Sequence, residues 1–336
     1  MRKNVKKAFA CAVAIAMIFG STIIPMSAKA EAISEEITEE EYDQNPDDYI
    51  AMDVYDVSSG ETETYYMKDY PDEIPTISQN KKNPIQNKVN TRKTRSGGPL
   101  RSIIGTDDRI VVDNTKRAPY KYIGKLEMYF SGSSVTRHNY NATAFLVGKS
   151  IALTSAHCVY ELNATGTFGN IYPSLSSDNA PDKNSIKYSI KKIHVPQQYK
   201  TAVKNGDDKN QRKYDYALIE LNNNPGSKFG YFSLGGYNTM YTLDNIMNEQ
   251  IVLVGYPENK GGKMYRQKGL LSGYTSGGYE FLYSMDTSDG QDGCPIIYPV
   301  GGGGYYVVGI NYQHGGDCNY ARYITKNIYD LVNKYK

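Results

Sequence analysis

Residues 143–159 read TAFLVGKSIALTSAHCV, two short apolar runs that are joined by Gly148 and Lys149 and end in small residues and a histidine. Runs of this length with turn-forming residues between them are typical of β-strands. The histidine, His157, follows the second run directly. It is therefore expected at the end of a strand, where a cleft can expose its imidazole ring.

The same texture continues through residues 102–336. Short apolar runs such as YIGKLEMYF, YALIEL, IVLVGY and YYVVGINY alternate with segments rich in Gly, Asn, Ser and Asp. The 32 tyrosines and 31 glycines of the chain suit half-buried strands and tight loops. The last stretch, TKNIYDLVNKYK, differs because Ile328, Leu331 and Val332 share one face of a helix. We therefore expect an all-β domain closed by a C-terminal helix.

The chain begins like an exported protein. A basic stretch, MRKNVKK, precedes an apolar run over residues 8–24, and AKA at 28–30 is the small-x-small pattern that signal peptidase reads. A membrane anchor is the alternative, but no second apolar stretch of spanning length follows. We predict a signal peptide over residues 1–30, and hence a secreted, extracellular protein that is not attached to a membrane after cleavage.

Residues 31–101 differ from both flanking regions in charge. Residues 31–48 are acidic, with no Lys or Arg, whereas residues 81–101 are basic. Neither block has sustained apolar periodicity, so we expect low order and no separate core. A disordered linker is one interpretation. We favour a propeptide, because TRKTRSGGPLR offers exposed sites to an activating protease, with Arg101 as the last residue removed and Ser102 as the new amino terminus.

The overall charge argues against two classes of partner. The chain has 38 Lys and Arg against 36 Asp and Glu, a formal charge of +2, so we expect neither nucleic-acid binding nor binding to a membrane surface. The four histidines are scattered, and in the only close His–Cys pair, His157 and Cys158, adjacent side chains diverge. We expect no metal, no cofactor and a monomer.

Two further segments carry chemistry together with His157. In KYDYALIEL, Asp215 precedes an apolar strand, where a buried carboxylate can accept a hydrogen bond from an imidazole and fix its tautomer. At 290–295, GQDGCP is a glycine-rich turn that leads into another strand. Such a turn can aim two backbone N–H groups at one point and form an oxyanion hole.

In this order, the three segments resemble the chymotrypsin-like serine peptidases, and within them the bacterial glutamyl endopeptidase (V8-like) family. The resemblance extends over residues 102–336 and includes RSIIGTDDR and VDNT at the mature start, VLVGYP, DTSDGQDGCPI and GINYQHGG. It implies two six-stranded β-barrels, an active site in the cleft between them, and protein or peptide substrates. The expected fold is a chymotrypsin-like double barrel with a C-terminal helix.

The resemblance also implies the roles of single residues. His157 matches the general base, Asp215 the orienting carboxylate, and the backbone N–H groups of Gly290 and Asp292 the oxyanion hole. The nucleophile position, a serine in the family, is Asp292. A carboxylate there would pair with His157, would oppose the negative charge of the oxyanion, and would form a mixed anhydride on attack. We expect almost no proteolysis by the chain as written.

Three alternatives to that interpretation stay open. Cys294 could serve as a thiol nucleophile, although alternate residues of an extended segment point in opposite directions. Asp292 could be a substitution in an active parent. The chain could also be a catalytically dead homologue that binds peptides or a partner protein through the cleft.

Substrate preference rests on a small set of pocket residues. The resemblance associates cleavage after Glu or Asp with Thr287 and with a freed amino group at Ser102. The family's pocket histidine is replaced by Asn311, which brings no positive charge, and His314 could compensate. Of the cysteines after the signal peptide, Cys294 and Cys318 are the favoured disulfide; three unpaired thiols, Cys158 included, are the alternative.

Overall fold

The computed structural model describes residues 37–70, 103–132, 135–161, 164–173, 185–237, 243–275, 278–314 and 318–336. The expected signal peptide and the cleavage site at Arg101 and Ser102 lie outside these residues, so both remain predictions. Among the residues described, the helices are too short or too polar to cross a membrane.

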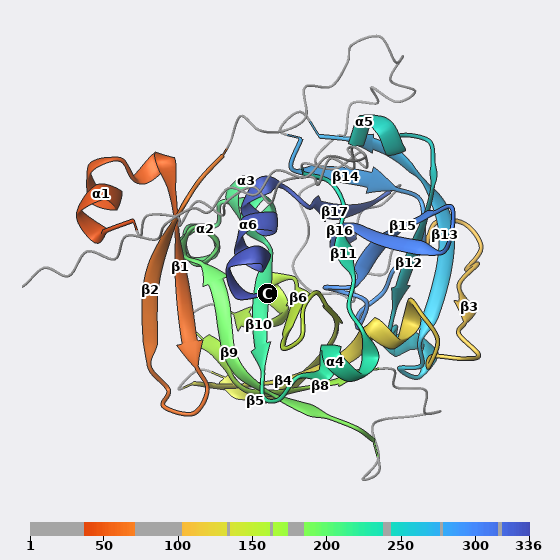
Figure 1. Ribbon diagram of the computed structural model, residues 1–336, viewed down its shortest axis with the longest axis horizontal. Helices are drawn as coiled ribbons and strands as arrows, with labels where there is room; N and C mark the ends of the chain where they lie inside the picture. The colour runs from red at the N-terminus through yellow and green to blue at the C-terminus, as the bar shows by residue number, and fades with distance from the viewer. Residues whose placement is uncertain are drawn as a thin grey trace, which may run out of the picture. The chain divides into compact units, whose positions relative to one another are not determined.

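Barrel 1 is a closed antiparallel barrel that has six strands among the described residues (Figure 1). The strand order is β9–β10–β6–β5–β4–β8, and pairing of β8 with β9 closes the ring. The strands are β4 (Ile123–Gly132), β5 (Val135–Leu146), β6 (Ile151–Thr154), β8 (Ala164–Pro173), β9 (Tyr188–Pro196) and β10 (Ala217–Leu221). A short β7 (Tyr160–Glu161) pairs with β8.

Barrel 2 has the same architecture. Its strands run in the order β16–β15–β12–β13–β14–β17, and pairing of β16 with β17 closes the ring. Two short strands, β3 (Ile110–Val111) and β11 (Ser233–Leu234), pair with β13 and β16. The six barrel strands of the described chain are β12 (Gln250–Gly255), β13 (Tyr265–Tyr274), β14 (Glu280–Tyr283), β15 (Pro295–Val300), β16 (Gly304–His314) and β17 (Asn319–Tyr323).

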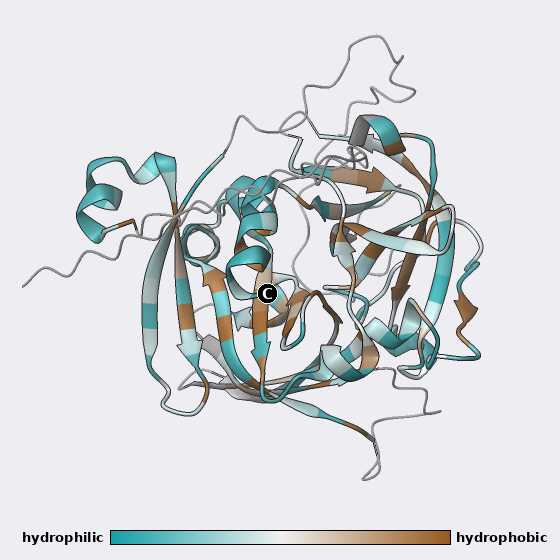
Figure 2. Ribbon diagram, in the orientation of Figure 1, coloured by the Kyte–Doolittle hydropathy of each residue, from teal (hydrophilic) through white to brown (hydrophobic). Residues whose placement is uncertain are grey.

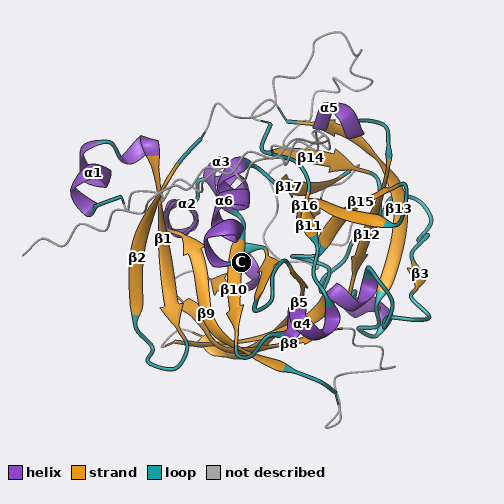
Figure 3. Ribbon diagram, in the orientation of Figure 1, coloured by secondary structure: helices purple, strands orange, loops and turns teal. Residues whose placement is uncertain are grey.

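Helices are short and lie outside the barrel strands (Figure 3). The C-terminal helix, α6 (Lys326–Tyr335), packs Ile328, Leu331 and Val332 into the core of barrel 1, as its periodicity predicts. The other α-helices are α1 (Glu39–Gln44), α2 (Gln197–Asn205), α3 (Asp208–Tyr214), α4 (Pro225–Phe229) and α5 (Leu243–Ile246). The 3-10 helices are η1 (Pro46–Asp48), η2 (Tyr120–Tyr122), η3 (Ala156–Cys158) and η4 (Glu258–Lys260).

The apolar runs of the sequence form the barrel strands. Hydrophobic residues recur along these strands in Figure 2, and strand β10 buries four of its five residues. Each barrel encloses apolar side chains, with Phe145 in the core of barrel 1 and Phe281 in that of barrel 2. The expected all-β, chymotrypsin-like double barrel with a C-terminal helix is confirmed.

The N-terminal region departs from the expectation. Low order over residues 31–101 is wrong for residues 37–70, which form α1, η1 and a hairpin of β1 (Tyr49–Asp56) and β2 (Thr62–Lys68). Strand β1 also pairs with β9 of barrel 1. The apolar stretch YIAMDVY, between the two charged blocks, has no core of its own but shares that of barrel 1.

Candidate active site

The pairing of β6 with β10 brings His157 and Asp215 together. Thr154, at the end of β6, lies opposite Ala217, at the start of β10. His157 follows Thr154 closely in η3, and Asp215 precedes Ala217 closely at the C-terminal end of α3. The antiparallel register therefore places both residues at the same end of the strand pair.

Asp215 binds His157 through both carboxylate oxygens. The imidazole Nδ1 lies 2.7 Å from Oδ2, and the backbone N–H of His157 donates to Oδ1 at 3.0 Å. Asp215 is 5% exposed, so little water competes for it. Burial is the largest single effect and opposes the charged imidazolium, but the Asp215 carboxylate together with Cys158 and Tyr140 raises the pKa of His157 well above its usual range. Nε2 remains as the ring nitrogen directed toward Asp292.

The turn at 290–295 requires glycine at two positions. Gly290 and Gly293 have φ angles of +87° and +76°, in the region that favours glycine. A Cβ on Gly290 would lie 2.3 Å from the carbonyl oxygen of Tyr256, and one on Gly293 would lie 2.0 Å from Thr154 Oγ1. The backbone of Tyr256 and the side chain of Thr154 therefore leave no room for a side chain at these two positions.

Thr143 of barrel 1 anchors this turn of barrel 2. Its backbone N–H donates to the carbonyl of Asp292 at 2.9 Å, and its hydroxyl donates to the carbonyl of Gly290 at 2.8 Å. The same hydroxyl accepts from the backbone N–H of Tyr256 at 3.1 Å. Thr143 is fully buried, so these bonds are shielded from water. The only sequence signal for this role is that Thr143 is a polar residue at the start of the apolar run TAFLV, and this signal was missed.

Asp292 faces the base. Its Oδ2 lies 3.7 Å from Nε2 of His157 and accepts a hydrogen bond from the hydroxyl of Tyr140 at 3.1 Å. Burial first, and the Asp292 carboxylate second, raise the pKa of Tyr140 well above its usual range, so the phenol keeps its proton and donates. Opposite charges about 4 Å apart attract by about 4 kcal/mol at an effective dielectric constant of about 20, before water at the partly exposed imidazole reduces this.

A segment from the start of the peptidase domain docks beside the turn through Asp286. The backbone N–H groups of Ile104 and Asp108 donate to its carboxylate at 2.7 and 3.0 Å, and Gln267 Nε2 donates at 3.1 Å. Asp286 is fully buried and immediately precedes Thr287. Nothing in the sequence around Asp286 indicates this role, because its partners lie far away along the chain.

Arg109 extends this docking to the turn itself. Its buried guanidinium donates to Ser288 Oγ at 2.8 Å and to Gln291 Oε1 at 2.7 Å. It also pairs with Asp107, and hydrogen bonding by Arg109 is the largest effect that lowers the pKa of Asp107. Gln291 lies between the two proposed oxyanion residues. Arg109 therefore positions the turn from outside it.

Two of the expected pocket residues are buried, and the side chain of Asn311 is already hydrogen-bonded within the protein. Thr287 and Asn311 are both fully buried. The Asn311 amide donates to the carbonyl of Gln291 at 2.8 Å, and its oxygen accepts from the hydroxyl of Tyr283. Asn311 therefore supports the turn. Ser102 lies outside the described residues, as does the side chain of His314.

The cysteine predictions are corrected. Cys158, Cys294 and Cys318 form no disulfide in the described part of the chain, so the favoured Cys294–Cys318 bridge is wrong. Cys294 packs inside the apolar core of barrel 2, and burial raises the pKa of its thiol well above the usual range. A protonated, enclosed thiol is a poor nucleophile, so the geometry does not favour Cys294 as a replacement for serine.

The known proteins that are similar to this chain are named as peptidases or proteases. The model of the trypsin-like peptidase domain matches residues 142–310, half of the chain, and this range contains His157, Asp215 and Asp292. A glutamyl endopeptidase of Bacillus licheniformis is 27% identical over 245 residues, 70% of each chain. A Bacillus subtilis protein named extracellular metalloprotease is 28% identical over 233 residues, 69% of this chain and 68% of its own.

A solved structure supports the fold. The structure of a Glu endopeptidase superposes with a TM-score of 0.55 at 22% identity and covers 69% of this chain and 98% of that protein. As for metal ligands, the described residues contain no group of three or more His, Cys, Asp or Glu side chains that could hold an ion.

Proposed function

Because this chain belongs to the family of trypsin-like peptidase domains, we propose that it is the precursor of a secreted endopeptidase of the glutamyl endopeptidase type, held inactive by Asp292. Its reaction would be hydrolysis of peptide bonds after Glu or Asp. One observation carries the proposal: the His157–Asp215 pair faces residue 292 on a glycine-rich turn, at 3.7 Å from Nε2 to the carboxylate.

With a hydroxyl at position 292, the site would perform acyl transfer. His157 Nε2 would accept the hydroxyl proton as the oxygen attacks the substrate carbonyl, while Asp215 holds Nδ1–H and stabilises the imidazolium. The backbone N–H groups of residues 290 and 292 would bind the oxyanion. His157 would then donate its proton to the leaving amine, and water would hydrolyse the acyl-enzyme.

With Asp292 in place, two of these steps fail. The carboxylate pairs with His157 and favours the protonated ring, which cannot accept another proton. Its negative charge lies beside the backbone groups that would bind an oxyanion. Tyr140 donates to the same carboxylate and so stabilises the unproductive arrangement.

A carboxylate preference is supported by the docked segment. Ile104 binds Asp286, the residue before Thr287. Two residues span at most about 7 Å, so an amino group freed at Ser102 could reach the vicinity of Thr287. Asn311 adds no charge and its amide is already bonded to Gln291, so the preference for Glu and Asp over Gln should be shallow.

Secretion and maturation rest on the sequence of the first 101 residues. The basic, apolar and small-x-small segments support export, and the basic stretch that ends at Arg101 supports cleavage by another protease. The alternative function is a catalytically dead homologue that binds peptides or a partner protein in the cleft. The substituted nucleophile position is the observation that favours it.

The deciding experiment is Asp292→Ser, assayed on casein and on peptides that vary the residue before the scissile bond. We expect endopeptidase activity that the parent lacks. Asp289→Ser is the matched control, because it makes the same change close by and should stay inert. Asp292→Ser combined with His157→Ala should also be inert. A folded but inactive Asp292→Ser protein would reject the proposed triad and favour the binding function.

A further inference from the structure

The N-terminal hairpin, residues 37–70, is built onto barrel 1 as an extension of its sheet. Strand β1 pairs antiparallel with β9, with Asp53 opposite Val195 and Tyr55 opposite Ile193, and β2 pairs with the other edge of β1 (Figure 1). Main-chain pairing of this kind is a recurring way to bind an extended segment. The contact surface on barrel 1 comprises β9, α2, α3 and α6.

Apolar side chains of the hairpin complete the core of barrel 1. Ile50 and Met52 are fully buried and belong to the same hydrophobic cluster as the barrel strands. Tyr65 of β2 packs against Tyr335 of α6 at 6.0 Å between ring centroids and lies beside His194 of β9. Departure of the hairpin would therefore expose part of this core to water.

Charges across the contact are complementary. Lys200 of α2 pairs with Asp53 at 2.8 Å, and Lys192 of β9 approaches Asp56 at 4.0 Å. Gln197 Nε2 adds a hydrogen bond to Asp53 at 2.7 Å. Each of these carboxylates belongs to the hairpin, and the amines belong to β9 and α2.

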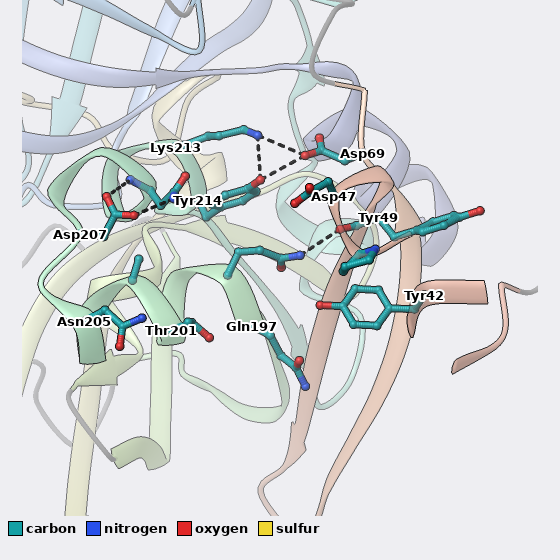
Figure 4. A pocket seen from close by; sticks show the side chains of 14 residues that line it. Tyr42, Asp47, Tyr49, Asp69, Gln197, Thr201, Asn205, Asp207, Lys213 and Tyr214 are labelled. Carbon is teal, nitrogen blue, oxygen red and sulfur yellow. Dashed lines mark hydrogen bonds and ion pairs between the residues drawn. The ribbon is translucent and has the colours of Figure 1, made fainter. Parts of the chain in front are cut away.

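The end of the hairpin is held by three side chains of the peptidase domain. Asp69 is 5% exposed and accepts hydrogen bonds from Lys213 and Tyr214, both at 3.1 Å, as Figure 4 shows. Asn327 of α6 donates to its other oxygen at 2.6 Å. Lys213 and Tyr214 directly precede Asp215. The hairpin thus braces the segment that carries the proposed orienting carboxylate.

A polar hollow lies beside this anchor. It lies between the hairpin and helices α2 and α3, and its lining includes Tyr42 and Asp47 on one side and Thr201 and Lys213 on the other (Figure 4). Gln198 crosses it and donates to the carbonyl of Tyr49 at 3.0 Å. The hairpin therefore meets barrel 1 on both sides of the hollow, through β9 and through the Asp69 anchor.

We propose that the N-terminal hairpin stays bound to the peptidase domain after the chain is cut between residues 71 and 101, as a second, non-covalently held chain. The hairpin is then a retained structural part of the mature protein, in contrast to a propeptide that is discarded. The inference rests on the proposed function only for the natural occurrence of that cut. The bound hairpin would keep the Asp69 contacts to Lys213 and Tyr214 in the cleaved form.

The test uses the secreted chain with a recognition sequence for a site-specific protease in place of residues 85–91. After cutting, size-exclusion chromatography at micromolar concentration is followed by mass spectrometry of each fraction. We expect the hairpin to co-elute with the peptidase domain. Elution of the hairpin as a separate peptide, with the domain still folded by circular dichroism, would overturn the proposal.

Two variants test which contacts keep the hairpin bound. Asp53→Asn together with Asp69→Asn keeps the shape of the hairpin and removes two charged contacts, so release should be at least about tenfold faster than in the parent. Glu63→Ala, at an exposed position of β2, is the matched control and should not change release. Equal release from all three proteins would contradict the interface described here.

Because retention is read by mass in the Asp292 chain, it needs no catalysis. An inactive Asp292→Ser protein would reject the proposed function and leave this result unaffected. Conversely, an active Asp292→Ser protein with a dissociated hairpin would reject only the retention of the hairpin.

Discussion

Barrel 1 brings an acid–base pair to the site, whereas barrel 2 brings a turn whose glycines keep their special conformations and whose central side chain is a carboxylate. His157 and Asp215 are joined at 2.7 Å. On the turn, Gly290 and Gly293 hold positive φ angles although residue 292 is not serine. The backbone conformation of the turn therefore does not require a serine at position 292.

The anchors of the turn explain this independence. Thr143 binds two of its carbonyl groups, and Arg109 binds the side chain of Gln291. None of these contacts involves the side chain of Asp292. The scaffold and the reacting group can therefore be changed separately.

The largest effect is expected at Asp215. In the Asp292→Ser background, Asp215→Asn should lower kcat by about 10⁴-fold, because the amide stabilises the wrong tautomer of His157 and no imidazolium. Steady-state kinetics on a peptide substrate measure this. Asp208→Asn, in the preceding helix α3, is the control and should leave kcat unchanged.

A smaller loss is expected when the anchor between the barrels is removed. Thr143→Val keeps the shape but deletes the hydroxyl that binds Gly290 and Tyr256, which should cost about 1–3 kcal/mol of unfolding free energy. In the Asp292→Ser background, kcat should fall by about tenfold or more, because the oxyanion turn loses its support. Thr143→Ser keeps the hydroxyl and should retain most activity; equal losses in both variants would contradict the anchor.

The pKa of His157, the proposed base, should depend on the carboxylate at position 292. Asp292→Asn should lower the pKa of His157, since an opposite charge within about 4–6 Å favours the charged form. NMR titration of the His157 ring measures this shift. An unchanged pKa would mean that the two groups do not interact in solution.

The same contact has a consequence for stability. The pKa of His157 is raised in the folded state, so its contribution is fully present below the unfolded pKa and is lost as pH rises through the folded pKa. Because Oδ2 of Asp292 lies 3.7 Å from Nε2 of His157, the stability advantage of the parent over Asp292→Asn should shrink as pH rises through the folded pKa of His157. Denaturant unfolding of both proteins at a series of pH values measures this difference in unfolding free energy.

The smallest effect concerns specificity. In the Asp292→Ser background, Asn311→His should raise the preference for Glu over Gln by several-fold, because hydrogen bonds to a charged donor are about twice as strong as neutral ones. The ratio of kcat/KM values for matched Glu and Gln peptides is the measurement. Equal ratios before and after the change would show that this position does not read substrate charge.

The sequence reveals those parts of the molecule that are encoded locally. Apolar runs and turns predict the strands, the small residues before His157 predict a strand end, and the glycines at 290 and 293 predict a special turn. Each of these features depends on a few neighbouring residues. The role of Asp292 could be judged because the pattern around it is unbroken.

The missed features depend on contacts between distant segments. Nothing near Thr143 or Arg109 indicates that they bind the turn, because their partners follow far along the chain. Cys294 reads as a possible disulfide partner until the closed barrel encloses it. The N-terminal hairpin was hidden by the charged blocks around it, since strand β9, its partner, supplies the core that it lacks.

The most direct test of the central claim is covalent labelling of residue 292 by a serine-directed phosphonylating reagent, read by mass spectrometry of the digested protein. We expect a single adduct at position 292 in Asp292→Ser, none in the parent, and none in Asp292→Ser combined with His157→Ala. Because the adduct forms at one atom, it reports the nucleophile, the base and the turn together. A folded Asp292→Ser protein that takes no label would contradict the proposed roles of residue 292 and His157. A label on the protein that also carries His157→Ala would contradict them too.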